Sequence, residues 1–251
     1  MSNRIHIRSN QLSSIKNTLI EEFESVFSEA IEDGSNDELI AELDKINQAM
    51  IQNGFSIGKV FEPQKDENWL GSYSPMKSPG IIRFNKISIL GLSIRILQEN
   101  VKKYNYSYKK IDLKKIIDTV FLLILHHELF HYYCDLLIYN ESHKKTAFIP
   151  EEEALAVACS FILAENRFMG PNHKFHFQEL FYENLKSTGY KDWKNYINYE
   201  DSFPAGVIEY LDKWAGYSNT NINIEKYSFI DRFYIHFKTV ISKPNVKFEL
   251  Y

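Results

Sequence analysis

The sequence predicts an α+β fold that is mostly helical, with one small sheet and a pair of helices near the N-terminus. Apolar residues recur mainly at helical spacing, most clearly in residues 10–32, where one face is apolar and the other polar. Segments typical of strands are few and short, and Ile81–Ile89 is the clearest of them. The chain has 251 residues, and its 18 Phe and 16 Tyr supply the volume of a large core.

Amphipathic helices are predicted over residues 10–32 and Asp37–Gln52, and a turn that contains glycine ends each of them. Strands follow at Phe55–Phe61 and Ile81–Ile89, separated by a long loop of turn-forming residues. The last part of the chain is ambiguous, although its closing VKFELY fits a strand. Further helices are predicted over Leu92–Lys103, Leu113–Tyr139, Glu151–Asn166, Phe175–Ser187, Asp192–Asn198 and Pro204–Trp214.

The composition shows no break that would mark a domain boundary, and Gly and Pro are sparse, at 10 and 7 residues. We expect an N-terminal helical segment, residues 1–54, to pack on a core domain of residues 55–251. One continuous domain is the alternative, because a chain of 251 residues is long enough for either arrangement.

Charge and hydropathy argue against two classes of partner. The net charge is −4, so we expect no nucleic-acid partner, and the lysine run within Val101–Lys115 is typical of a solvated surface. The longest apolar run, Val120–Leu125, is far shorter than the roughly 20 residues of a membrane span, so we expect no membrane contact. The first residues lack the apolar segment of a secretory signal. Cys134 and Cys159 lie in apolar helical patterns, which favours buried thiols and a cytoplasmic location.

The segment LILHHELFHYYCD carries a metal-binding pattern, H-E-x-x-H. His127 and His131 lie four residues apart, so both imidazoles project from one face of a helix, one turn apart. Both can then reach a single ion at about 2.0–2.1 Å, and Glu128 lies near enough to hold a water. Leu129 and Phe130 are expected to face the core. A surface helix with a chance histidine pair is disfavoured, because the apolar run VFLLIL precedes the motif.

Three consecutive glutamates open a later helix, in the segment PEEEALAVACSFILAE. Here the chain resembles the gluzincin metallopeptidases, in which a second helix supplies a glutamate in the pattern E-x-x-A/S-D/N. Glu153 begins the stretch EALAV, whose first four positions fit this pattern. The resemblance implies that Zn²⁺ is held by His127, His131 and Glu153. Glu151 or Glu152 remains open as the ligand instead, and acidic residues also favour a helix N-terminus for its dipole alone.

The resemblance is incomplete at Val157, where the family often has Asp or Asn to orient a ligand histidine. Another acceptor must then serve, and Asp135 is a candidate. Upstream, GSYSPMKSPGIIRFN is similar to the turn and edge strand of small bacterial metallopeptidases of the ImmA/IrrE type. That similarity implies that Ile81–Asn85 is an edge strand, to which an extended substrate would add. The whole resemblance covers the chain from about Phe55 to Arg167.

The resemblance implies a zincin-like metallopeptidase core that hydrolyses peptide bonds of an intracellular protein. Glu128 would be the catalytic base that activates the zinc-bound water. A further donor would stabilise the oxyanion, and the candidates are His173, His176, Tyr182, Tyr234 and His236. The partners expected are a protein or peptide substrate and a regulatory protein, for which the N-terminal helices offer a docking module.

Two other interpretations remain open. One is a catalytically silent zinc-binding interaction module, which Val157 favours and Glu128 disfavours, because a structural site needs no base. The other is a zinc hydrolase of a non-peptide amide or ester, which would use the same residues.

Overall fold

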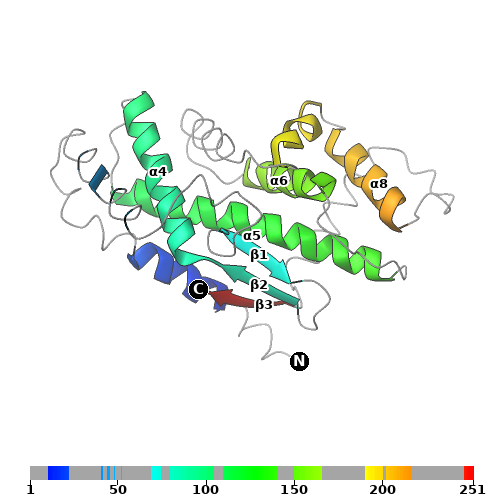
Figure 1. Cartoon of the computed structure of the whole chain (residues 1–251), viewed down its shortest axis with the longest axis horizontal. Coiled ribbons are helices and arrows are strands. Elements are labelled where there is room, and N and C mark those ends of the chain that lie inside the picture. Colours follow the sequence, from blue (N-terminus) through cyan, green and yellow to red (C-terminus); the bar gives the residue numbers. More distant parts are fainter. Residues whose placement is uncertain are drawn as a thin grey trace.

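Helices account for most of the described residues, and a three-stranded sheet accompanies them (Figure 1). The structure is a computed structural model, and it describes residues 11–22, 41, 44, 45, 48, 52, 69–74, 80–104, 110–140, 150–165, 190–199, 202–215 and 246–251. Residues 11–22 form a helix. The other elements are β1 (Gly71–Ser74), β2 (Gly80–Phe84), α4 (Lys86–Tyr104), α5 (Lys110–Asn140), α6 (Pro150–Glu165), the 3-10 helix η1 (Tyr190–Tyr196), α8 (Ser202–Ala215) and β3 (Val246–Leu250). The prediction of a mostly helical α+β fold is confirmed.

The strand order in the sheet is β1-β2-β3, with β2 in the middle. β1 pairs with β2 in antiparallel fashion, Gly71 opposite Phe84, and β3 pairs with β2 in parallel, Val246 opposite Gly80. Both sides of β2 are therefore occupied. The prediction that Ile81–Asn85 forms an edge strand is wrong, because β3 returns from the far end of the sequence to take the second side.

The chain leaves β2 earlier than the sequence predicts. The strand ends at Phe84 and α4 begins at Lys86, so the predicted strand Ile81–Ile89 is too long. Asn85 is the physical reason, because its Oδ1 accepts a hydrogen bond from the backbone N–H of Ser88 at 3.1 Å. Asparagine in this position caps a helix and satisfies one of the N–H groups that the first turn leaves without a partner.

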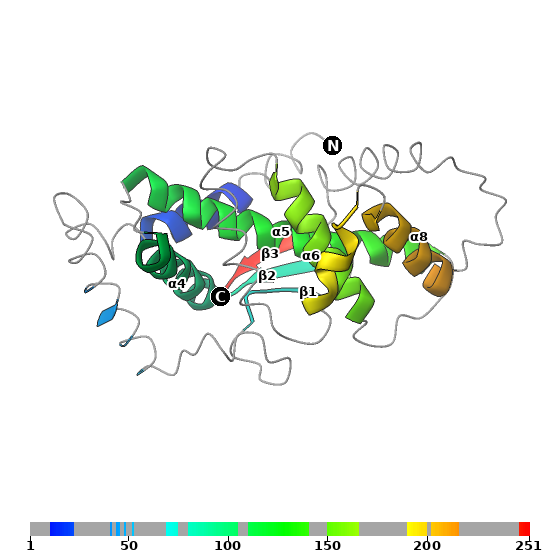
Figure 2. The same cartoon turned by 90° about the horizontal axis from the view of Figure 1, so that it is seen from above.

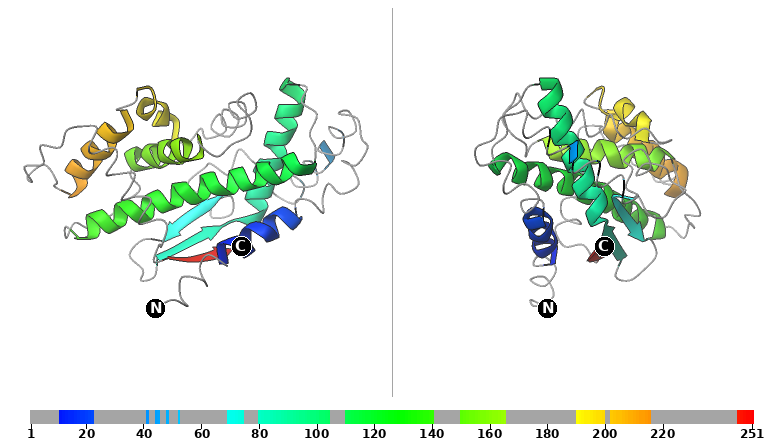
Figure 3. Two further views of the ribbon diagram at one scale, coloured as in Figure 1. Left: turned by 180° about the vertical axis from the view of Figure 1, so that it is seen from behind. Right: turned by 60° about the vertical axis from the view of Figure 1, so that its left-hand side comes forward.

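The helix α5 lies between the sheet and the pair α6 and α8, as Figure 1 and the left view of Figure 3 show. Alternate side chains of the sheet are buried on this face: Ile82, Phe84, Val246 and Phe248. The rings of Phe84 and Phe121 of α5 lie 4.8 Å apart across the contact. Ile15 and Leu19, from helix 11–22, are buried in the same cluster. The apolar half of α5 is therefore a central buried helix, as predicted.

A second cluster of buried side chains joins α5 to α6 and α8. Phe130 and Tyr133 of α5 pack with Leu155 of α6 and with Phe203 and Val207 of α8. Viewed from above in Figure 2, α6 lies across the middle of α5. This packing places the first turn of α6 beside the part of α5 that carries the histidines.

Most other predicted elements agree with the structure. The predicted helices Leu113–Tyr139, Glu151–Asn166 and Pro204–Trp214 correspond to α5, α6 and α8, and the closing strand corresponds to β3. The predicted helix Asp192–Asn198 corresponds to η1. Outside the described residues lie the predicted strand Phe55–Phe61, the helix Phe175–Ser187 and much of the two N-terminal helices. Within the described part of the chain, no helix is both long and apolar enough to cross a membrane.

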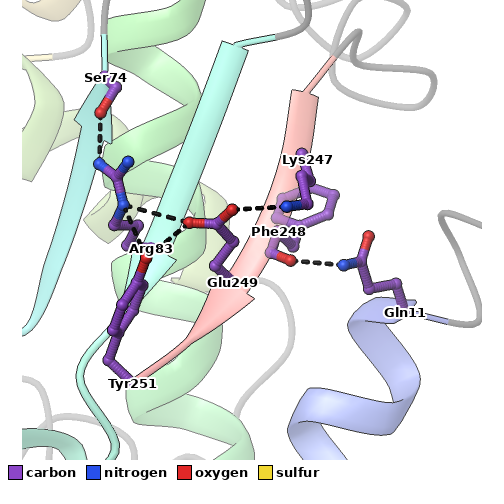
Figure 4. A network of polar contacts seen from close by, with 7 residues as sticks. All are labelled: Gln11, Ser74, Arg83, Lys247, Phe248, Glu249 and Tyr251. Carbon is purple, nitrogen blue, oxygen red and sulfur yellow. Dashed lines mark hydrogen bonds and ion pairs between the residues drawn. The ribbon is translucent and has the colours of Figure 1, made fainter.

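Polar side chains gather on the sheet face that points away from α5 (Figure 4). Arg83 pairs with Glu249 at 3.2 Å and also donates to the hydroxyls of Ser74 and Tyr251, so its contacts join all three strands. Because these groups are partly exposed, an ion pair of this kind contributes on the order of 0–1 kcal/mol. Apolar burial against α5, rather than this network, therefore holds the sheet in place.

Candidate metal centre

Two helices bring three metal-ligating side chains together. α5 supplies His127 and His131, and the first turn of α6 supplies Glu153. The Nε2 atoms of the two histidines lie 3.1 Å apart. Oε2 of Glu153 lies 3.1 Å from Nε2 of His127 and 3.4 Å from Nε2 of His131. The three side chains are 13% or 14% exposed, so this triangle of ligand atoms is mostly buried but within reach of solvent.

The size of the triangle matches a tetrahedral metal site. Bonds of about 2.0–2.1 Å keep two ligand atoms of a tetrahedral ion about 3.3 Å apart. The three edges of the triangle, 3.1, 3.1 and 3.4 Å, lie on both sides of that value. The donor set therefore fits an ion of this kind, and three protein ligands leave one tetrahedral position for water or substrate.

Three consecutive glutamates open α6, and each meets a different partner. Successive side chains of a helix point about 100° apart, so neighbours do not share a face. Glu153 reaches the triangle, whereas Glu152 turns inward to Nδ1 of His131. Glu151 is exposed and pairs with Lys213 of α8 at 2.7 Å. Of the three glutamates that the sequence leaves open, the structure places Glu153 where a third ligand would be needed.

The charges in this cluster favour a cation. Burial disfavours the charged form of His131, but the carboxylates of Glu153 and Glu152 outweigh it and raise the pKa of the imidazole well above its ordinary value. Burial also disfavours the charged form of Glu153, but His131 and His127 outweigh it and lower the pKa of that carboxyl well below its ordinary range. A metal ion would replace the proton that these groups otherwise share.

Glu128 lies beside the two histidines and is 5% exposed. Burial raises the pKa of its carboxyl, and the charges of His127 and His131 limit the rise. The backbone N–H of Tyr73 in β1 donates a hydrogen bond to this carboxylate. A carboxylate with a raised pKa is suited to accept a proton and to return it.

β1 lies very close to α5 at Gly71. A Cβ atom there would lie 2.5 Å from Cγ2 of Ile124 and 2.9 Å from Oε1 of Glu128. Both distances are far below an ordinary van der Waals contact, and the branched side chain of Ile124 is stiff. The absence of a side chain at Gly71 therefore lets the strand lie directly against the Glu128 carboxylate.

His131 is oriented by Glu152, a residue predicted only as an alternative ligand. Its Nδ1 lies 2.6 Å from Oε1 of Glu152, and the Tyr210 hydroxyl of α8 donates to the other carboxylate oxygen. Glu152, rather than the candidate Asp135, is therefore the partner that orients His131. Asp135 instead accepts a hydrogen bond from the Tyr73 hydroxyl. Tyr210 and Tyr73, from distant segments, therefore donate hydrogen bonds to the buried carboxylates of Glu152 and Asp135.

Tyr190 lies beside the triangle, where no spacing in the sequence predicts it. Its ring stacks on that of His127, with centroids 5.8 Å apart, and its hydroxyl is hydrogen-bonded to Glu153. Burial and the negative charges of Glu153 and Glu128 raise the pKa of this hydroxyl well above its ordinary value. Tyr190 therefore keeps its proton and can act as a hydrogen-bond donor next to the candidate ligands.

The predicted oxyanion donors lie outside the described residues: His173, His176, Tyr182, Tyr234 and His236. Tyr190 is held at the site because η1 packs on α6, where the rings of Trp193 and Phe161 lie 5.0 Å apart. One tyrosine is a weak signal in a chain that has 16 of them, and local spacing says nothing about where η1 packs.

Comparison with known proteins found no significant match to this chain among protein-family models, curated proteins or solved structures. What the site can do is therefore inferred from its own residues. Three ligand atoms are arranged at the spacing of a tetrahedral ion, a buried carboxylate lies beside them, and a protonated tyrosine adjoins them. Together these groups can hold a cation, move a proton and donate a hydrogen bond.

Proposed function

We propose that the protein is a zinc-dependent hydrolase that cleaves peptide bonds. The observation that carries this proposal is the position of the buried Glu128 carboxylate beside the triangle formed by His127, His131 and Glu153. An ion that only stabilises the fold needs no such neighbour. A base next to a metal with an open position is instead the arrangement of a metal-assisted hydrolase.

Zinc is the metal that the donor set favours. Two imidazole nitrogens and one carboxylate oxygen suit zinc, whereas magnesium and calcium prefer oxygen ligands alone. Structural zinc sites usually have four protein ligands, and catalytic sites have three and an open position. Three metal-ligating side chains converge here among the residues that the structure describes.

The chain's own residues would perform the proton transfers. When bound, zinc supplies Lewis-acid chemistry, polarising a carbonyl and making a nearby water more acidic. Glu128 takes a proton from the attacking water and returns it to the amine that leaves. The Tyr73 N–H and the close contact at Gly71 hold the Glu128 carboxylate in one position for both transfers.

An extended substrate would bind along β1 rather than along β2. β2 is paired on both sides, whereas β1 is an outer strand among those described. A peptide that adds to β1 by backbone hydrogen bonds would lie close to Glu128, because β1 contacts that residue at Gly71 and Tyr73. The free side of an outer strand is suited to recognise a peptide backbone, and the position of β1 beside Glu128 therefore supports a peptide as the substrate.

The order of the elements supports a zincin-like core of the gluzincin type. The strands β1 and β2 precede the helix α5 with H-E-x-x-H, with α4 between them, and the helix α6 with the facing glutamate comes next. Val157 lacks the acceptor that the family often has, but Glu152 supplies one to His131. The catalytically silent alternative therefore loses the feature that favoured it.

Tyr190→Phe is expected to slow hydrolysis by about 100–1000-fold, the usual cost of losing one oxyanion donor, and to leave zinc bound. We propose that its hydroxyl donates to the carbonyl oxygen as that oxygen becomes negative. The measurement is kcat on a quenched-fluorescent peptide, together with zinc content. Tyr199→Phe is the matched control, because Tyr199 is 80% exposed. Equal kcat values for the two variants would remove Tyr190 from the mechanism.

Removal of the metal tests the proposal most directly. We expect the purified chain to carry about one zinc ion, as three converging ligands require. Hydrolysis of a random mixture of quenched-fluorescent peptides should stop when a chelator removes the zinc and return when zinc is added. A chain that binds zinc but cleaves no peptide would favour the interaction module. Cleavage of amide or ester compounds alone would favour a non-peptide hydrolase.

A further inference from the structure

A buried chain of hydrogen bonds joins α8 to His131. Oε1 of Glu152 lies 2.6 Å from Nδ1 of His131, and the Tyr210 hydroxyl donates to Oε2 of the same carboxylate. Glu152 and Tyr210 are each 2% exposed, so bulk water does not compete for these bonds. The chain of bonds therefore runs from α8 through α6 to the side of the imidazole that faces away from the triangle.

These hydrogen bonds determine which nitrogen of neutral His131 carries the proton. An ionised carboxylate only accepts hydrogen bonds, so Nδ1 must be the donor toward Glu152. Nε2 then presents a lone pair to the triangle, and a metal needs a nitrogen without a proton. The other tautomer would direct a hydrogen toward Nε2 of His127, 3.1 Å away, and would block the place of the ion.

We infer that Glu152 and Tyr210 are positioning residues that set the metal affinity of the site and couple the docking of α8 to metal binding. The inference rests on the proposed function in one respect, that His131 is a metal ligand. Coupling between two binding events is reciprocal. If the contact of Tyr210 with Glu152 strengthens metal binding, then bound metal strengthens the docking of α8 to the same degree.

Glu152→Gln and Tyr210→Phe test the positioning role in the full chain, with zinc titrated against a chromophoric chelator. Losing the outer partner of a ligand histidine costs about 10–100-fold in metal affinity, which is the loss expected for Glu152→Gln. A smaller loss, up to about 10-fold, is expected for Tyr210→Phe, because the carboxylate remains. Glu151→Gln is the matched control and should bind zinc as the wild type does, since Glu151 is exposed and pairs with Lys213.

Two further measurements separate positioning from a general loss of stability. The visible spectrum of the cobalt-substituted chain reports ligand geometry, and it should change in Glu152→Gln and Tyr210→Phe but not in Glu151→Gln. Hydrogen exchange reports the docking of α8. Zinc should slow exchange of the α8 amides in the wild type, and should slow it less in Tyr210→Phe.

The outcomes distinguish this inference from the proposed function. Zinc affinity and cobalt spectra equal to wild type in both variants would overturn the inference and leave the proposed function standing. A wild-type chain that binds no zinc would overturn both. If circular dichroism shows that Glu152→Gln does not fold, Tyr210→Phe decides, because that variant removes a single hydroxyl.

Discussion

Glu128→Gln is expected to lower kcat for peptide hydrolysis by about 100–10,000-fold, the range that a general base contributes. Glutamine has nearly the same shape, and its amide oxygen can still accept the hydrogen bond from the Tyr73 N–H that the carboxylate accepts now. It cannot take up a proton at neutral pH. The loss should therefore appear in kcat, while zinc affinity stays close to that of the wild type, because Glu128 lies outside the triangle of ligand atoms.

The control for this experiment is Glu99→Gln in α4. Glu99 is a partly exposed glutamate that pairs with Arg95 at 2.7 Å, so the same chemical change is made away from the triangle. Kinetics on one quenched-fluorescent peptide and zinc content by atomic emission should be measured for both variants. If Glu128→Gln hydrolyses the peptide as fast as Glu99→Gln does, the proposed enzymatic function is wrong, and zinc content then tests the metal site by itself.

Glu153→Ala is expected to weaken zinc binding by more than about 100-fold, beyond the 10–100-fold cost of removing an outer partner of a ligand. The variant leaves only the two imidazoles of the triangle, and it removes the negative charge that most strongly favours a cation next to His131. Hydrolysis should be lost with the metal. Titration of zinc against a chelator measures the affinity, and excess zinc should restore little activity.

Glu151→Ala is the matched control for this variant. Both residues lie in the first turn of α6 and carry the same charge, but Glu151 pairs with Lys213 at the surface. Its loss should leave zinc affinity unchanged. An equal loss of zinc affinity in the two variants would mean that the first turn of α6 attracts the ion only through its overall negative charge. An unchanged affinity in Glu153→Ala would mean that another residue is the third ligand.

The local part of the site could be predicted from the sequence because it depends on helix geometry alone. The four-residue spacing of His127 and His131 and the burial of Leu129 and Phe130 follow from one helix with one apolar side. The extra length of the strand Ile81–Ile89 arose from the same kind of argument. There apolar residues recur past Asn85, at Ile87 and Ile89, and the cap that begins the helix is a single side chain.

The long-range part could not be predicted, because it depends on which helices pack together. Glu151, Glu152 and Glu153 look alike in the sequence, and partners on α8 distinguish them, Lys213 for the first and Tyr210 for the second. Likewise, β3 pairs with β2 although the two strands lie far apart in the sequence, and this pairing makes the expected edge strand a central one. Periodicity within a segment carries no information on such pairings.

The contact between β1 and α5 at Gly71 has a consequence for the evolution of such a chain. Even one methyl group there would press on Ile124 and on the Glu128 carboxylate, so even alanine is disruptive at this position. In a hydrolase built this way, natural selection would guard a glycine outside the motif as closely as the glutamate within it. An orthologue that has lost turnover would be free to replace the glutamate but not the glycine, because the clash with Ile124 concerns packing and not catalysis.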